Sequence, residues 1–469
     1  MAMTKPYEKL LSRKRLRPST RPEEELLKET ESDRSRVIYS AAFRRLQRKT
    51  QVFPLEENAA VRSRLTHSLE VAHVGRYLTT SVFSQFGRDK AESLGLTDDS
   101  KLAMTNIVET ACLLHDIGNP PFGHFGEAAI SNWYTDYVRR ASEYRATSEA
   151  HSQNIKSFDG NPQGFRVITK LAGADGSTGM NLTVSQIAST VKYPCTPSGI
   201  SDASPLTKKA GIFTTEAAVW ECVKQELQMS DGSRFPLAYL MEAADDISYC
   251  LSDIEDGIEK GLLTHELFTS DLVSRLDKHP SAQSIVKTAT DNSAKYGKTV
   301  EAAVVFRSEL VRFLVQNAAS VYVQQHDQVL AGTHKGLVER GSDSGNILSA
   351  IKKSVGHLLY GKRSSHEREL VGHAAIKGIL SKFECVLKLD RDNMGSISGG
   401  GRCSKNLEEE MRLFSLLAGK HVAAYRKATE DVDDEQEHAL RVHLIVDFVA
   451  GMTDIFALRT YQTLAGISL

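Results

Sequence analysis

Thirteen consecutive residues, His115 to Glu127, hold four side chains that are able to bind a metal ion or move a proton. Their sequence is HDIGNPPFGHFGE, with two His, one Asp and one Glu. Imidazole and carboxylate groups are common metal ligands and common general acids or bases. The Gly and Pro residues between them interrupt any helix. The segment therefore predicts a helix that ends at His115-Asp116, followed by a tight turn that holds His124 and Glu127.

A single His-Asp pair cannot hold a metal ion, so further ligands must come from distant parts of the chain. His67 lies in the segment RLTHSLEV, and Asp245 lies in AADDISY. Neighbouring residues on a helix point about 100° apart, so His115 and Asp116 converge on one ion only at a helix end. A set of two His and two Asp without thiolate suits Mn, Fe, Co, Ni, Zn or Mg, and does not single one out.

The segment around Asp245 carries a second acid, Asp246, at the next position. Asp245, Tyr249 and Asp253 follow i, i+4, i+8 spacing and share one helix face, so Asp245 is the preferred ligand. Structural alternatives remain open for each residue taken alone. Tyr249 fits a core tyrosine, Asp253 fits a solvated acid, and His124 fits a packed turn histidine.

The composition is typical of a soluble globular protein, with 469 residues of which 41% are hydrophobic and 25% charged. No run of about 18 apolar residues is present, so no membrane span is predicted. The N-terminus lacks the apolar region of a secretory signal. Six cysteines without a CxxC pair fit a reducing cytosol, with neither a disulfide framework nor a zinc-thiolate site. A cytoplasmic location is therefore expected.

The formal net charge of -1 conceals a basic N-terminus, because residues 1–50 carry 14 Lys and Arg against 7 Asp and Glu. The densest stretch is RKRLR at residues 13–17. Two interpretations remain open: a solvated arm or intersubunit contact, and a patch that binds nucleic acid. No aromatic residues alternate with these charges, which favours the first.

Apolar residues recur mainly at helical spacing and strand-like alternation is scarce, so the chain is predicted to be all-α. Loops are expected where Gly and other turn residues gather. Helices are expected at 33–50, 61–86, 101–116 and 236–258, and along most of the chain after residue 260, with loops at 171–181, 194–206 and 390–401. The predicted architecture is one helical core with an insertion and a helical C-terminal region.

Several segments, taken in order, resemble the HD superfamily of metal-dependent phosphohydrolases. Within that superfamily the chain is most similar to the bacterial deoxyguanosine triphosphate triphosphohydrolases. The segments are FRRLQRKTQVF (43–53), RLTHSLEV (64–71), HDIGNPPFGHFGE (115–127), KYP (192–194), AADDISY (243–249) and GMTD (451–454). The resemblance thus extends from the first predicted helix almost to the end of the chain.

The resemblance implies three parts of the chain and a set of site residues. The parts are a basic arm with the first helix at 1–60, an HD phosphohydrolase domain at 61–260 with an insertion at about 140–230, and a helical C-terminal region at 261–469 that completes the nucleotide pocket and the oligomer contacts. The implied metal ligands are His67, His115, Asp116 and Asp245, and the implied catalytic residues are His124 and Glu127. The implied substrate-binding residues are Gln51, Val52, Arg64, Lys192, Tyr193, Lys209, Tyr249, Asp253, Glu369 and Arg402.

The resemblance also implies what each substrate-binding residue does. Gln51 and Asp253 would meet the sugar 3′ hydroxyl, and Tyr249 would pack on the deoxyribose and exclude a 2′ hydroxyl. Phosphates would be held by Arg64, Lys192 and Tyr193, and by Lys209, for which the register against Lys208 stays open. Glu369 and Arg402 are the acid and the cation expected to read guanine.

The implied activity is metal-dependent hydrolysis of dGTP to deoxyguanosine and inorganic triphosphate, which would control dNTP pools. One divalent metal per subunit is expected, Mg2+ or Mn2+ first, with Fe, Co, Ni or Zn as alternatives. Relatives suggest a homo-oligomer, either hexamer or tetramer, and activation by single-stranded DNA; no membrane partner is expected. Rival hypotheses are a broad dNTP triphosphohydrolase, another HD phosphohydrolase activity, and a nucleic-acid-binding regulatory protein with a residual HD site.

Overall fold

A computed structural model describes residues 5–20, 25–141, 149–173, 178–297, 300–360, 363–399 and 405–467. These residues form helices and no β-strand, with isolated bridges only between Arg15 and Thr183 and between Thr50 and Ser63. The predicted all-α class is confirmed. Nowhere in the described ranges does a helix combine the length and the apolar character that crossing a membrane requires.

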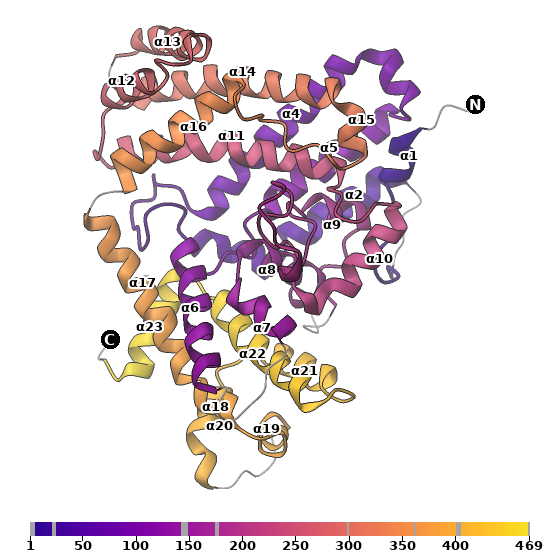
Figure 1. Ribbon diagram of the computed structural model, residues 1–469, viewed down its shortest axis with the longest axis vertical. Helices are drawn as coiled ribbons and strands as arrows, with labels where there is room; N and C mark the ends of the chain where they lie inside the picture. Colours follow the sequence, from indigo (N-terminus) through magenta and orange to yellow (C-terminus); the bar gives the residue numbers. More distant parts are fainter. Residues whose placement is uncertain are drawn as a thin grey trace.

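The molecule is elongated and has two bodies of helices, one above the other in Figure 1. The upper body contains α1 (Pro6–Leu10), α2 (Leu26–Ile38), α3 (Ala41–Arg45), η1 (Leu46–Arg48), α4 (Arg64–Ser93), α5 (Asp98–Leu114), α9 (Val184–Ser189), α10 (Ala217–Leu227), α11 (Pro236–Glu259), α12 (His265–Arg275), α13 (Pro280–Ala294), α14 (Val300–Gln324), α15 (His326–Leu330), α16 (Asp343–Val355) and η5 (Gly356–Tyr360). The lower body contains α6 (Gly123–Ala141), α17 (Arg363–Lys382), α18 (Glu384–Lys388), α19 (Arg391–Ser398), η6 (Lys405–Leu407), α20 (Glu408–Phe414), α21 (Gly419–Ala428), α22 (Asp434–Ala450) and α23 (Asp454–Ala465). Between the bodies lie α8 (Gly160–Arg166), η2 (Val167–Leu171), η3 (Pro197–Gly199) and η4 (Thr214–Glu216), while α7 (Glu149–Lys156) packs against α6 in the lower body.

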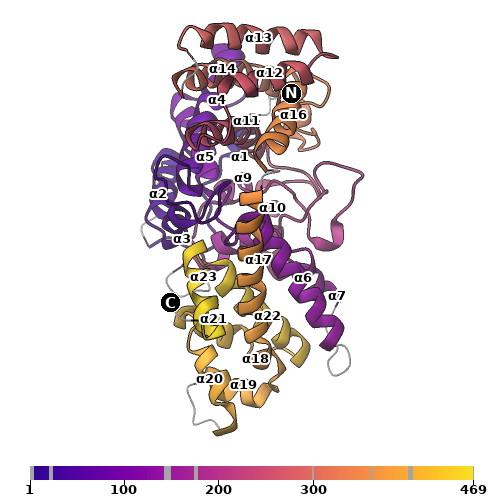
Figure 2. The same cartoon turned by 90° about the vertical axis from the view of Figure 1, so that its left-hand side faces the viewer.

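Each body has its own hydrophobic core. In the upper core, α4 packs against α5, α11 and α14, and buries side chains such as Val71 and Leu78. In the lower core, α6 and α17 lie side by side in both views and bury Trp133 and Ile379 (Figures 1 and 2). Since α6 begins at Gly123, the HDIGNPPFGHFGE segment passes from one core to the other.

Local sequence signals explain where the site-bearing helices begin. Ser63 caps α4 by accepting a hydrogen bond from the Thr66 amide, and Thr66 returns one to Ser63. The helix predicted at 61–86 extends to Ser93, with a break at Gly87, whose φ of 70° lies outside the helical region. Pro236 begins α11, as its fixed φ favours.

Two predictions of secondary structure were wrong. The helix expected at 33–50 is divided, because α2 ends at Ile38 and the Ser40 side chain accepts from Phe43 N to start α3. The loop expected at 390–401 is a helix, α19, over its described part, because the Asp390 side chain caps it through Asn393 N. The glycines that suggested a loop lie mostly at or beyond its C-terminal end, where residues 400 and 401 fall outside the described ranges.

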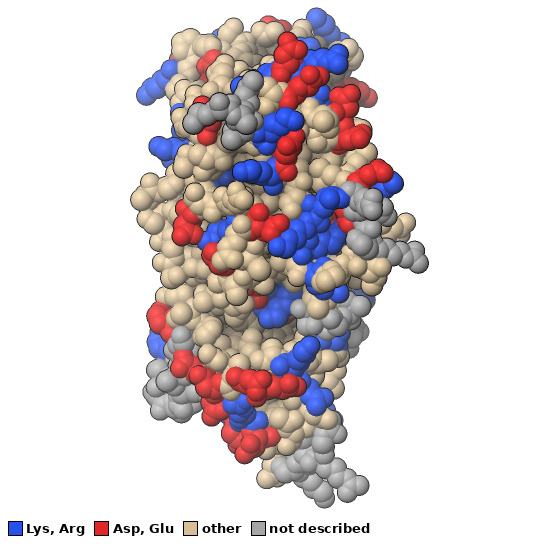
Figure 3. All heavy atoms as spheres, turned by 90° about the vertical axis from the view of Figure 1, so that its right-hand side faces the viewer, with Lys and Arg blue, Asp and Glu red and all other residues tan. Residues whose placement is uncertain are grey.

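The basic N-terminal stretch is partly neutralised within the protein. Arg15 is buried and forms ion pairs with Glu29 and with Asp33, at 2.5 Å for the latter. Lys14 pairs with Glu226 at 2.5 Å. Figure 3 shows Lys and Arg side chains gathered near the middle of one side of the molecule. The nucleic-acid interpretation stays a prediction, with fewer exposed charges available to it than the sequence suggested.

Candidate active site and metal centre

The His-Asp pair stands at the end of α5, as predicted. His115 is the C-cap residue of that helix, and its Nδ1 atom lies 2.6 Å from the Cys112 carbonyl oxygen. A carbonyl oxygen only accepts, so Nδ1 carries the proton, and in the neutral ring Nε2 presents a lone pair. This arrangement prepares His115 to bind a metal through Nε2.

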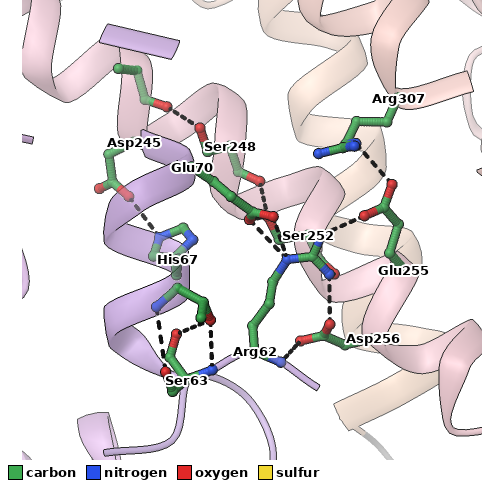
Figure 4. A network of polar contacts seen from close by, with 12 residues as sticks. Arg62, Ser63, His67, Glu70, Asp245, Ser248, Ser252, Glu255, Asp256 and Arg307 are labelled. Atoms are coloured by element: carbon green, nitrogen blue, oxygen red, sulfur yellow. Dashed lines mark hydrogen bonds and ion pairs between the residues drawn. The ribbon is translucent and has the colours of Figure 1, made fainter. Parts of the chain in front are cut away.

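Three of the four proposed ligands, His67, His115 and Asp116, form one cluster, and Asp245 of α11 lies beside its two imidazoles. The Asp245 Oδ1 atom lies 3.6 Å from Nε2 of His67 and 3.6 Å from Nε2 of His115. The Asp116 Oδ2 atom also lies 3.6 Å from Nε2 of His115. One ligand atom each of His67, His115 and Asp116 falls within 4.8 Å of the others. Figure 4 shows His67 of α4 and Asp245 of α11 pointing toward each other.

These donors fit a divalent metal ion. Ligands at about 2.1 Å from an ion are separated from each other by roughly 3 to 3.5 Å, close to the observed spacing. Among the described residues, Nε2 of His67 and Nε2 of His115 are buried without a hydrogen-bond partner. Burying imidazole nitrogens in this way is costly unless an ion accepts their lone pairs. The absence of sulfur ligands leaves the identity of the metal open.

Cations and imidazoles keep the two carboxylates ionised. Burial alone would raise the pKa of Asp116. The Arg64 guanidinium and, to a smaller extent, His115 act in the opposite direction, and the pKa lies below its ordinary value. Burial acts in the same direction on Asp245, whose pKa is lowered overall by His115, His67 and Lys192. Both groups are therefore ready to act as anionic ligands at neutral pH.

His124 and Glu127 are paired on the opposite side of the turn. The His124 Nδ1 atom lies 2.6 Å from Glu127 Oε2, and Glu127 Oε1 accepts a hydrogen bond from Gly160 N at 2.7 Å. The hydrogen bond that His124 donates to Glu127 raises the pKa of His124. The prediction that a turn holds this pair was wrong, because both residues lie in the first turns of α6.

The turn between the two pairs touches the backbone of α8. A Cβ atom at Gly118 would lie 2.0 Å from the Gly164 backbone nitrogen, so no other residue fits there without displacing α8. Gly160, at the start of the same helix, is the residue that bonds Glu127. The glycine at 118 thus allows α8 to support the His124-Glu127 pair.

A cavity of about 680 Å³ opens beside both pairs, at the junction of the two cores. Its lining contains most of the predicted site residues: Gln51, Val52, Arg64, His115, Asp116, His124, Glu127, Lys192, Tyr193, Lys209, Tyr249, Asp245 and Glu369. His67 lies beneath the surface with no exposed area. Arg402 falls outside the described residues.

Several cations face this cavity. Arg64, Lys192, Lys208 and Lys209 all line it, so both lysines of the open register lie at the cavity and the choice between them stays a prediction. The Lys209 ammonium pairs with Asp159 Oδ2 at 2.5 Å. Burial would lower the pKa of Lys192, but Glu242, Tyr193, Asp246 and Asp245 together outweigh burial, so the pKa is raised. This wall therefore brings several cationic side chains close to the proposed metal ligands.

Tyrosines form the other side of the cavity. The Tyr249 hydroxyl lies 3.0 Å from the Tyr360 hydroxyl, which donates a hydrogen bond to Asp253 Oδ2. Asp253 is only 1% exposed and lies behind Tyr360, not at the cavity surface. The side-chain oxygen of Gln51 is buried and, among the described residues, has no hydrogen-bond partner. It is therefore available to a ligand.

The family is decided by comparison with known proteins. Residues 64–156 match the HD domain, and residues 410–463 match the phosphohydrolase-associated domain. A probable deoxyguanosinetriphosphate triphosphohydrolase of Pseudomonas aeruginosa is 35% identical over 95% of this chain and 94% of its own length. Deoxyguanosinetriphosphate triphosphohydrolases of Yersinia enterocolitica and Serratia proteamaculans are 34% and 33% identical, each over 96% of this chain, and over 96% and 97% of their own lengths.

The chain belongs to the deoxyguanosinetriphosphate triphosphohydrolase family. The resemblance read from the sequence is thereby confirmed, and the family is one of enzymes that carry an HD phosphohydrolase domain. The phosphohydrolase-associated match covers α21, α22 and most of α23. The second matched domain of this chain therefore lies in the lower body.

Some residues of the site in this family member were not predicted. Tyr360 lies at the end of η5 and reaches the cavity only through tertiary packing, so no local signal marks it. Asp159 orients Lys209 and caps α8 through Asn161 N. An Asp before Gly-Asn-Pro is a helix-start signal that would have identified it as a cap.

A network of charged groups holds α4 against α11 next to the metal ligands. Arg62 donates to Glu70 at 2.8 Å and to Asp256 at 2.6 Å, and also pairs with Glu255 (Figure 4). Arg307 pairs with Glu255 at 2.8 Å. Because Arg62 lies next to Ser63, the N-cap of the helix that carries His67, this network fixes His67 relative to α11.

Proposed function

We propose that the protein hydrolyses dGTP to deoxyguanosine and inorganic triphosphate in a metal-dependent reaction. The observation that carries the proposal is the position of Arg64, Lys192, Lys208 and Lys209 on the cavity wall that also exposes the metal ligands. A single metal site alone would suit any metal-dependent phosphohydrolase. Four cations beside it match a substrate with several phosphate groups, whose charge would otherwise repel a nucleophile.

The proposed ligands of the metal are His67, His115, Asp116 and Asp245. A divalent ion bound there supplies Lewis-acid polarisation of a phosphate oxygen and a water of lowered pKa. Mg2+ or Mn2+ is proposed first, because imidazole and carboxylate ligands without thiolate accept either ion.

His124 is the proposed general acid. Its Nδ1 atom is held by Glu127, so Nε2 is left to face the cavity. The Glu127 hydrogen bond raises the pKa of His124, which favours the protonated form that a general acid needs. Protonating the departing 5′ oxygen avoids a strongly basic alkoxide, and such catalysis contributes roughly 100- to 10,000-fold in rate.

The remaining wall would select a deoxynucleotide. Tyr249, supported by Tyr360, is proposed to pack on the deoxyribose and leave no room for a 2′ hydroxyl. Gln51 offers its buried carbonyl oxygen to the 3′ hydroxyl. The Tyr360 hydroxyl donates a hydrogen bond to Asp253. Asp253 would reach the 3′ hydroxyl only if this hydrogen bond is broken or shared. Glu369 lines the cavity, where a carboxylate can accept hydrogen bonds from guanine.

Turnover of the four dNTPs and of GTP, each with Mg2+ and with Mn2+, tests the proposal. We expect dGTP to be the best substrate, GTP to be poor, and triphosphate to be the product. Equal turnover of all four dNTPs would favour the broad-specificity alternative, and pyrophosphate or orthophosphate as product would contradict the proposal. His124→Ala is the matched control, since it should retain the metal and lose most of kcat.

Further proposals concern the assembled protein and its place in the cell. We propose a cytoplasmic homo-oligomer that controls dNTP pools, with the three parts of the chain divided as the sequence predicted. Activation by single-stranded DNA is also proposed. Stimulation of dGTP turnover at low salt tests the activation, and turnover unchanged by added single strands would contradict it. Light scattering of the purified protein gives the subunit number.

A further inference from the structure

Asp454, the first residue of α23, bonds two separate parts of the active site. Its Oδ1 atom accepts a hydrogen bond from Phe122 N at 3.0 Å. Its Oδ2 atom accepts from Thr50 N at 3.0 Å and from Thr50 Oγ1 at 2.6 Å. The carboxylate is only 1% exposed, so all these bonds are made away from bulk water. None of the roles described above involves Asp454.

The bond to Phe122 supports an unusual backbone conformation directly before His124. Phe122 has a φ of 62°, in the left-handed region that non-glycine residues rarely adopt. Gly123 follows with a φ of 56°, and a Cβ atom there would lie 2.7 Å from Arg64 Nη2. Such a conformation is unfavourable for a non-glycine residue and persists only where its surroundings hold it. Asp454 supplies part of that support.

The bonds to Thr50 fix the other wall of the cavity. Thr50 immediately precedes Gln51 and Val52, both of which line the cavity. Lys49, the residue before Thr50, links the same three segments through hydrogen bonds that it donates. Its buried ammonium donates to the Asn119 carbonyl at 2.5 Å and to the Ala450 carbonyl at 2.9 Å. Hydrogen bonds therefore connect each of three segments to the other two: residues 49–50, 119–122 and 450–454.

We infer that Asp454 is a positioning residue that sets the place of His124 and of Gln51 together. The inference rests on the role proposed above for His124. Asp454 does not line the cavity; it acts through the Phe122 amide and through Thr50. A displacement of about 1 Å at a catalytic group typically costs on the order of 100-fold in rate, so the effect on turnover should be large.

The test is a double-mutant cycle between Asp454→Asn and His124→Ala, with kcat from single-turnover dGTP hydrolysis. The amide cannot accept from both Phe122 N and Thr50 N, so Asp454→Asn should lower kcat by about 10- to 100-fold. In the His124→Ala background it should change kcat by less than about twofold, because the group that it positions is already gone.

Asp33→Asn is the matched control. Asp33 is buried and accepts from Thr183 N at 2.9 Å and from Thr183 Oγ1 at 2.7 Å, the same pair of bonds that Asp454 makes with Thr50. It joins α2 to the loop before α9, outside the cavity lining. A general loss of stability should therefore act equally in both backgrounds for this variant.

The possible outcomes separate the inference from the proposed function. Equal losses from Asp454→Asn in both backgrounds would overturn the inference alone. Full activity of His124→Ala would overturn the proposed acid, and the inference with it. If Asp454→Asn does not fold, Thr50→Val replaces it, since this change removes only the hydroxyl bond. It should raise KM for dGTP severalfold with little change in kcat, and an unchanged KM would contradict the inference.

Discussion

Arg64 Nη1 lies 2.6 Å from Asp116 Oδ2, so a buried guanidinium directly contacts a proposed metal ligand. The pair holds the pKa of Asp116 below its ordinary value even though burial opposes this. Arg64 therefore has opposite effects on the binding of the metal ion and on the binding of the nucleotide. It competes with a divalent cation for Asp116, and it attracts a triphosphate.

Replacing Arg64 should separate these effects. We expect Arg64→Met to bind Mn2+ about tenfold more tightly in the absence of nucleotide, because a positive charge beside the site is removed. The KM for dGTP should rise at least about tenfold, because the phosphates lose a cation. Metal titration and steady-state kinetics check both. Arg88→Met, an exposed position on the same helix, should change neither, and weaker Mn2+ binding by Arg64→Met would contradict the expectation.

Asp245 and Asp246 are neighbours with different partners. Asp245 faces the two imidazoles, whereas Asp246 pairs with Lys352 at 3.0 Å. Asp245→Asn should lower metal affinity by at least about 10- to 100-fold, the range seen even for residues that only support a ligand. Asp246→Asn should keep the metal. The metal content of each purified protein after dialysis gives the answer, and a reversed order would assign the ligand to Asp246.

Activity should fall as the pH rises through the pKa of His124, since a general acid works only when protonated. The Glu127 hydrogen bond raises that pKa, although burial opposes it. Glu127→Gln should therefore move the alkaline limb of the kcat profile to lower pH, by about one unit. Profiles of kcat at saturating dGTP measure this. An unmoved limb would mean that another group donates the proton, and Glu149→Gln on α7 serves as an exposed control.

Burial raises the pKa of Asp253 to about 7, although the Tyr360 hydrogen bond acts to lower it. In the unfolded chain the same carboxyl ionises near 3.8, so its contribution to stability is full below that pH and is lost as the pH rises through 7. Asp253→Asn, which cannot ionise, should raise Tm at pH 8 by roughly 1–4 °C. The gain should vanish at pH 4. Calorimetry of the metal-free protein at both values checks this, and equal gains at both would contradict it.

Local signals predicted much of the fold. The helices that begin at Arg64, Asp98 and Pro236 were expected within a few residues, because caps, prolines and apolar spacing act over one or two turns. The break between α2 and α3 was missed because it depends on one serine, Ser40, acting as a cap inside an apolar pattern. The helix α19 was missed because its glycines outweighed the cap at Asp390.

The candidate site was predicted from the resemblance more than from spacing. The structure brings His67, His115, Asp116 and Asp245 together, although the roles assigned to them stay predictions. Tyr360 was not predicted, since its place beside Tyr249 depends on how η5 packs on α11. Asp454 was part of a segment that carried the resemblance, but no local pattern suggested that its carboxylate reaches Thr50 and Phe122.

The bonds of Asp454 also have a consequence for the growing chain. Thr50 and Asp454 are 404 residues apart in sequence. At about 5–20 residues per second, Thr50 is synthesised roughly 20–80 s before its partner. The turn before His124 is therefore complete in sequence long before the contact that holds it can form. A nascent or truncated chain without Asp454 should fold much of its upper body and still be inactive, so that activity appears only after Asp454 has been synthesised.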